Sequence, residues 1–161
     1  MNRSAVILQV EDDANDVLLL QYAFRTARIS NPLQSVPNVP RAIDYLTGRG
    51  EFSDRTLFPF PCLVLSDIKL PGETGLELLQ WIRAQPALRG LVVIMFTSSS
   101  SPAEIDRAYE LGANSFIIKP AGADKLVELV KSLHGYWIEQ NRFSSTRMSP
   151  GAQHGAPGSP G

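Results

Sequence analysis

Short apolar runs recur along the chain, and most of them lack the polar–apolar alternation of a strand with one face in water. The runs are residues 5–10, 33–36, 62–67, 91–97 and 115–119. Strands of this kind are buried on both faces, which is typical of parallel sheets. Because a helical segment follows each run, we predict an α/β fold with helices on both faces of a doubly wound parallel sheet.

The segments after the runs carry helix signals. The predicted helices are residues 11–28, 40–48, 72–85, 101–113 and 123–140. In the first helix, Asp13 or Asn15 is a candidate N-cap. Its predicted apolar face comprises Val17, Leu20, Tyr22 and Phe24. Residues 49–61, with two prolines and several aromatic residues, are expected to form a loop.

Length and composition favour one folded domain, which we place at residues 4–143 of the 161. Residues 144–161 are rich in Ser, Gly and Pro and are expected to form a disordered tail. A net charge of −1 predicts no nucleic-acid or membrane-surface partner. Cys62, the single cysteine, lies in an apolar run, so we expect a core residue and a cytoplasmic protein.

Charged and hydroxyl residues follow the predicted strands where parallel strands end together. Glu11 and Asp12 follow the first strand, and Asp67 ends the third. Thr97 and Lys119 end the fourth and fifth strands. In an open parallel sheet these ends meet at one edge, where functional sites gather.

The acids at this edge would repel one another unless a cation joins them. Two carboxylates about 4 Å apart repel by about 4 kcal/mol at an effective dielectric constant near 20. Lys119 alone does not offset Glu11, Asp12 and Asp67, and oxygen ligands suit Mg²⁺. The sequence has no HExxH, CxxC or histidine cluster, which disfavours zinc.

A site that combines carboxylates, Mg²⁺, a hydroxyl and a lysine is suited to binding a phosphoryl group. No Walker loop follows the first strand, so nucleotide binding is not supported. Asp67 is then the candidate nucleophile, which would form an acyl phosphate. The plainer alternatives are a cap or turn role for Asp67, and helix-dipole acids for Glu11 and Asp12.

Taken in order, Glu11-Asp12, Asp67, Thr97 and Lys119-Pro120 resemble the receiver domain of bacterial response regulators. The resemblance covers about residues 4 to 140 and implies a flavodoxin-like sheet in the order 2-1-3-4-5. It implies that Asp67 accepts phosphate from a histidine kinase, and that Thr97 and Lys119 contact the phosphoryl group. It also implies Mg²⁺ ligation by Asp12, Asp67, Glu11 and the backbone carbonyl of Lys69, and a cis Lys119–Pro120 peptide.

Phe116 stands where the resemblance places an aromatic switch residue, with core packing as the alternative role. The resemblance implies that phosphorylation changes the surface of the fourth helix, fifth strand and fifth helix. Because Phe lacks a hydroxyl, this chain cannot use the hydrogen bond that a tyrosine would supply there.

The chain is also similar to the single-domain regulators that partner bacterial phytochromes. The similar segments are "DVLLLQYAF", the 49–61 insertion, "TSSS", "ELGANSFIIKP" and a final helix with Trp137. This likeness implies a red-light-sensing histidine kinase, a bacteriophytochrome, as phosphodonor.

The predicted function is therefore a single-domain response regulator in two-component signalling, and not an enzyme in the usual sense. A phosphorelay intermediate, a phosphate sink and a phosphorylation-independent docking module remain alternatives. An Asp-nucleophile phosphatase is disfavoured, because that class needs a second Asp where this chain has Lys69.

Aromatic residues crowd the end of the last helix, beyond the length needed to cover the sheet. They are part of "GYWIEQNRF", which contributes Tyr136, Trp137, Ile138 and Phe143. Such an apolar excess predicts a homodimer through the last helix and its neighbour. His134 and His154 are expected to be exposed and inert.

Overall fold

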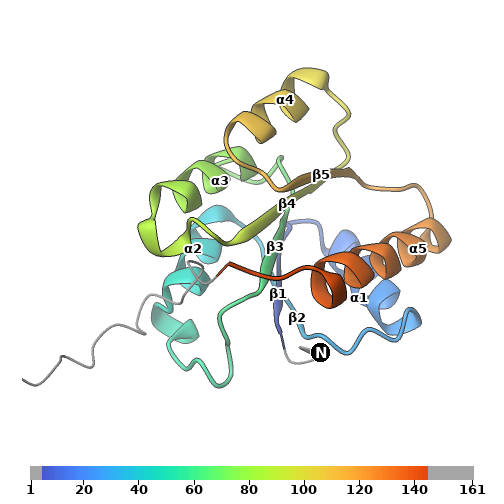
Figure 1. Cartoon of the computed structure of the whole chain (residues 1–161), viewed down its shortest axis with the longest axis horizontal. Coiled ribbons are helices and arrows are strands. Elements are labelled where there is room, and N and C mark those ends of the chain that lie inside the picture. The colour runs from blue at the N-terminus through green and yellow to red at the C-terminus, as the bar shows by residue number, and fades with distance from the viewer. Residues whose placement is uncertain (1–4, 145–161) are drawn as a thin grey trace, which may run out of the picture.

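The computed structural model describes residues 5–144 and contains the predicted parallel sheet. Its strand order, β2-β1-β3-β4-β5, confirms the predicted topology (Figure 1). The strands are Ile7–Val10 (β1), Leu33–Val36 (β2), Leu63–Ser66 (β3), Val92–Thr97 (β4) and Ser115–Ile118 (β5). Residues 145–161, and with them nearly all of the predicted tail, lie outside the described residues.

Helices cover both faces of this sheet, with α1 and α5 on one side and α2 and α3 on the other (Figure 1). The helices are Ala14–Thr26 (α1), Val39–Thr47 (α2), Gly75–Ala84 (α3), Pro102–Glu110 (α4) and Ala123–Leu133 (α5). Two 3-10 turns, Gly50–Phe52 (η1) and Pro86–Leu88 (η2), and a π-helical segment, His134–Gln140 (η3), complete the elements. Each long helix lies where the apolar spacing predicts one.

Side-chain caps determine where several helices begin. Asp13, not Asn15, caps α1, and its Oδ1 accepts hydrogen bonds from the backbone N–H groups of Asn15 (2.8 Å) and Asp16 (3.1 Å). Thr74 and Glu77 form a reciprocal capping box at α3. Ser101 caps α4, as the Ser-Pro pair at its start predicts.

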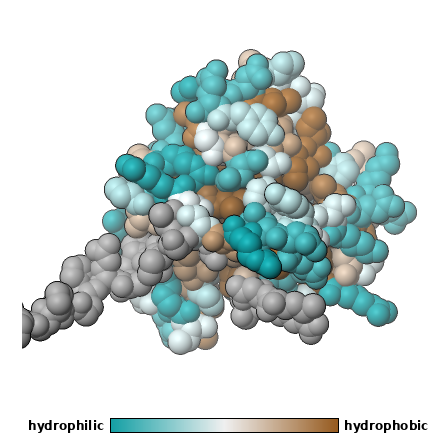
Figure 2. Space-filling view, in the orientation of Figure 1, coloured by the Kyte–Doolittle hydropathy of each residue, from teal (hydrophilic) through white to brown (hydrophobic). Residues whose placement is uncertain are grey.

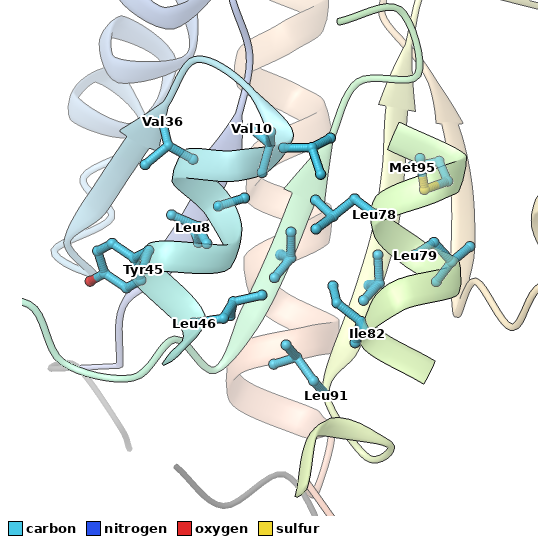
Figure 3. Packing of buried hydrophobic residues seen from close by; sticks show 14 of the residues in the cluster. Leu8, Val10, Val36, Tyr45, Leu46, Leu78, Leu79, Ile82, Leu91 and Met95 are labelled. Atoms are coloured by element: carbon cyan, nitrogen blue, oxygen red, sulfur yellow. The ribbon is translucent and has the colours of Figure 1, made fainter. Parts of the chain in front are cut away.

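Two apolar clusters, one on each face of the sheet, form the core. Figure 3 shows the cluster under α2 and α3, where Leu46, Leu78 and Ile82 pack over the strands. On the other face, Leu20 and Phe24 of α1 pack with α5, and Cys62 is buried there as predicted. Tyr22 does not belong to this face and is 46% exposed. A two-residue step turns a helix by about 200°, so Tyr22 points away from Leu20.

The 49–61 insertion has a small aromatic core of its own. Phe52 and Phe58 pack edge-on at 5.1 Å, and both rings contact Tyr45 of α2. The buried Tyr45 hydroxyl donates to the carbonyl of Pro59 at 2.9 Å. Arg55 donates to the carbonyls of Leu46 and Phe58. The segment predicted as a plain loop is therefore tied to α2 by specific bonds.

The end of the last helix differs from the prediction. Ile138 is buried, and Trp137 and Phe143 pack against the α1–α5 cluster, so much of the aromatic excess belongs to the core. Tyr136 is 56% exposed. His134 is half-buried with a ring nitrogen 3.1 Å from Oδ1 of Asn31, so the prediction that it is exposed is wrong. His154 lies outside the described residues.

Residues 5–144 contain no cis peptide bond, and the Lys119–Pro120 peptide is trans. The cis prediction is therefore wrong. The trans isomer of an X–Pro bond is favoured by about 0.5–1 kcal/mol, and it still lets Lys119 reach its partners. Among residues 5–144, no helix combines the length and the apolar character that crossing a membrane requires.

Candidate functional site

The strand register brings the predicted site residues to one edge of the sheet. Val10 pairs with Ser66, Ser66 with Met95, and Thr97 with Ile118, so the strands end side by side. The residues at these ends line an open pocket of about 320 Å³. Its lining comprises Glu11, Asp12, Asp13, Asp16, Asp67, Lys69, Thr97, Ser98, Ser99 and Lys119.

Lys119 lies at this pocket and binds three of the carboxylates that line it. Its Nζ donates to Glu11 Oε2 at 2.6 Å, to Asp67 Oδ2 at 2.8 Å and to Asp16 Oδ2 at 2.9 Å. Burial lowers the pKa of Lys119, but these hydrogen bonds to carboxylates raise it overall above its ordinary value. Lys119 is therefore a permanent cation at neutral pH.

Asp67 is held as a carboxylate at the end of β3. Its Oδ1 accepts a hydrogen bond from the backbone N–H of Ile68 at 2.7 Å. Burial raises the pKa of Asp67, but the hydrogen bonds from Lys119 and Thr97 lower it overall below its ordinary value. Asp67 is thus charged and lies at the pocket, as a nucleophilic oxygen must.

Glu11 is the buried acid of the site. Burial raises the pKa of this carboxyl above its ordinary value, although Lys119 and the backbone N–H of Asp13 both donate to it. A buried carboxylate with a raised pKa gains from additional positive charge nearby. The site therefore has a physical reason to attract a further cation.

The other predicted residues divide into two groups. Asp12 and Lys69 line the pocket, and Thr97 is buried at the end of β4 beside Asp67. Phe116 lies elsewhere, half-buried against the apolar cluster on the α2–α3 face. The structure thus brings all the predicted reacting and metal-binding residues together and places the predicted switch residue away from them, against the apolar cluster.

Sequence reasoning missed two residues of the site. Asp16 reaches Lys119 from the first turn of α1, and its position one turn after the Glu11-Asp12 pair was an available signal. A Cβ at Gly75 would lie 1.8 Å from the carbonyl oxygen of Asp67, so only glycine fits there. Nothing in the local sequence pattern marks that close approach.

The donors of the pocket fit a hard divalent cation. Within residues 5–144, no group of three or more His, Cys, Asp or Glu side chains is arranged to hold a metal ion. Glu11 and Asp67 instead share the ammonium of Lys119. The pocket is lined by five carboxylates and two lysines, so negative charge is in excess, and its oxygen donors are the type that Mg²⁺ or Mn²⁺ prefers.

Comparison with known families agrees with this geometry. The response regulator receiver domain family matches residues 7–131, which is most of the described chain. The chain belongs to this family of receiver domains. Membership of this family assigns the chain to two-component signalling and to a fold that accepts a phosphoryl group.

The similar proteins are response regulators, and several of them are named for phytochromes or for red-light signalling. Response regulator Rcp1 of Synechocystis sp. is 30% identical over 138 residues, which cover 86% of this chain and 92% of Rcp1. Regulator RPA3017, from red-light signalling in R. palustris, has a structure with a TM-score of 0.84 at 33% identity. The phosphorylated cyanobacterial phytochrome response regulator RcpA has a TM-score of 0.80 at 28% identity. Both structures match 88% of this chain and 99% of their own. Rcp1 has also been solved with Mn²⁺ bound.

Proposed function

We propose that Asp67 is the phosphoacceptor of this receiver. In the transfer, an Asp67 oxygen bonds to the phosphorus of a kinase phosphohistidine. The phosphorus–nitrogen bond breaks and its electron pair returns to the imidazole. The observation that carries the proposal is the ionised Asp67 carboxylate, which is hydrogen-bonded to Lys119 and Thr97 and lines an open pocket.

We propose that Lys119 and Thr97 hold the oxygens of the transferred group. The ammonium supplies positive charge, and the buried hydroxyl supplies a donor with little freedom to move. Asp12, Asp67, Glu11 and the backbone carbonyl of Lys69 would hold Mg²⁺. The bound ion would offset negative charge that gathers on the phosphoryl oxygens.

We propose that the output surface is formed by α4, β5 and α5. β5 is an edge strand, and Ile118 at its end is 47% exposed although it lies one residue before Lys119. Figure 2 shows hydrophobic surface between α4 and α5, where β5 runs in Figure 1. Thr97 pairs with Ile118, and Phe116 lies half-buried on the same strand, so β5 links Thr97 directly to this surface.

We propose a bacteriophytochrome histidine kinase as the phosphodonor, since the matches include regulators named for phytochromes or red light. A receiver unit over residues 4–143 acting in the cytoplasm is consistent with this donor. A homodimer through the last helix is supported by exposed Tyr136, on a smaller apolar surface than the sequence predicts.

Three other functions would also use a phosphorylated Asp67. A phosphorelay intermediate or a phosphate sink would need no output surface, so exposed Ile118 and Tyr109 favour signalling to a partner. A phosphatase of the Asp-nucleophile type is disfavoured, because Lys69 lines the pocket where that chemistry needs an acid.

Beryllofluoride with Mg²⁺, which mimics the acyl phosphate, tests the phosphoacceptor. We expect the wild-type protein to bind it in a Mg²⁺-dependent way, followed by ¹⁹F NMR, and Asp67→Asn to bind none. Asp106→Asn removes an equal charge from the exposed face of α4 and should bind like the wild type. Equal binding by Asp67→Asn and wild type would overturn the proposed function.

A further inference from the structure

Asp16 binds the central lysine of the site, and none of the roles proposed above uses it. It lies in the first turn of α1, and its Oδ2 accepts a hydrogen bond from Nζ of Lys119 at 2.9 Å. Its side chain is 36% exposed, against 12% for Asp67 and 3% for Glu11. Asp16 is therefore the carboxylate that faces solvent in this three-acid cluster.

The ammonium of Lys119 has no hydrogen left for a new partner. An ammonium group carries three N–H donors, and Glu11, Asp16 and Asp67 accept one each. Glu11 and Asp67 are each fixed by a second bond, from the backbone N–H groups of Asp13 and Ile68. The bond to Asp16 is the longest and the most exposed, so it costs least to break.

We infer that Asp16 is a positioning residue that competes with the phosphoryl group for Lys119. The inference rests on the proposed function of Asp67. Phosphorylation turns the Asp67 carboxylate into an uncharged acyl group and places several negative oxygens beside Lys119. A carboxylate that already neutralises part of the ammonium charge weakens the hold of Lys119 on these oxygens. Asp16 thereby lowers the affinity of the site for a phosphoryl group.

The test compares two asparagine variants that remove the same charge from the start of α1. Asp16→Asn removes the carboxylate that binds Lys119. Asp13→Asn removes a pocket carboxylate that caps the helix, and asparagine caps a helix equally well. At saturating Mg²⁺, we expect Asp16→Asn to bind beryllofluoride about two- to five-fold more tightly than Asp13→Asn, the range of a partly exposed ion pair.

Two further variants separate competition from a structural effect. Asp16→Ala removes every acceptor and should bind at least as tightly as Asp16→Asn. Asp16→Glu keeps a carboxylate in reach of Nζ and should return the affinity toward that of the wild type. Unfolding curves followed by circular dichroism check that each variant is folded before its affinity is compared.

The possible results distinguish this inference from the function on which it rests. Equal affinities for Asp16→Asn and Asp13→Asn would show a general effect of charge and overturn the competition. Weaker binding by Asp16→Asn would mean that Asp16 assists Lys119, which also overturns it. If the wild-type protein binds no beryllofluoride, or if Asp67→Asn binds it as well, the proposed function fails and the inference with it.

Discussion

Lys119 gathers acids from three separate segments of the chain, and this explains how a charged cluster is tolerated beside the core. Glu11 follows β1, Asp16 begins α1 and Asp67 follows β3. The ammonium offsets their mutual repulsion, but the net charge of the four side chains stays negative. This excess of negative charge favours binding of a metal ion at the same place.

Asp67 also depends on a neighbour that has no side chain. Gly75 begins α3, and its backbone N–H donates to the carbonyl of Ile68 at 2.9 Å. A Cβ there would meet the Asp67 carbonyl carbon at 2.9 Å as well as its oxygen. The helix can pack this closely on the site only because residue 75 is glycine.

We expect Gly75→Ala to destabilise the protein by about 1–3 kcal/mol, the usual cost of overpacking a core position. Because the clash is with the Asp67 backbone, beryllofluoride affinity should fall as well. Urea unfolding and ¹⁹F NMR measure the two effects. Gly135→Ala is the matched control, since a Cβ at Gly135 meets no atom within 4 Å. Equal stability of the two variants would contradict the close approach.

The elements of the fold differ in how they reach their stability. The strands and helices are specified by local apolar spacing, whereas the 49–61 insertion is held by bonds to distant residues. Tyr45 of α2 is fully buried, and its hydroxyl reaches across to the carbonyl of Pro59. Arg55 binds the carbonyl of Leu46, the residue next to Tyr45, so the insertion and α2 form one unit.

We expect Tyr45→Phe to cost about 0.5–1.5 kcal/mol, because the Pro59 carbonyl loses its donor. Burial raises the pKa of Tyr45 to about 12. In the unfolded chain this hydroxyl ionises near its ordinary pKa of about 10. Folding then retains a proton that the unfolded chain loses, so stability should fall as pH rises from about 10 to about 12.

Urea unfolding across this pH range measures the effect. The Tyr45→Phe variant should lose less stability than the wild type between these pH values. Tyr22→Phe changes an exposed tyrosine and serves as the control, and we expect it to have the same free energy of unfolding as the wild type across this range. Parallel curves for Tyr45→Phe and the wild type would show that the buried hydroxyl does not titrate as described.

At the scale of the whole molecule, the burial of the helix end reduces the surface available for self-association. Trp137, Ile138 and Phe143 complete the α1–α5 side of the core, and Tyr136 is left outside. Tyr136 packs edge-on against Trp137 at 5.0 Å, so the exposed ring adjoins the α1–α5 cluster. A dimer formed here would be centred on this ring.

We expect a protein truncated after residue 144 to show a concentration-dependent mass by light scattering. Tyr136→Ser should shift it toward the monomer, because a central exposed aromatic residue carries much of the binding energy of an interface. Leu57→Ser removes an exposed apolar side chain from the 49–61 insertion, away from the last helix, and should leave the mass unchanged. A monomeric mass at every concentration would remove the dimer proposal.

The order of the elements and the chemistry of the site follow from features that are local in the chain. Apolar runs specify the buried strands, and the position of Asp67, Thr97 and Lys119 after those runs places them at one edge of any parallel sheet. Tertiary packing decided the remainder: the rotation of α1 that brings Asp16 to Lys119, the contact of Gly75 with Asp67, and the packing of Trp137 against the core. These depend on how elements distant in sequence meet, and residue spacing within one segment does not determine that meeting.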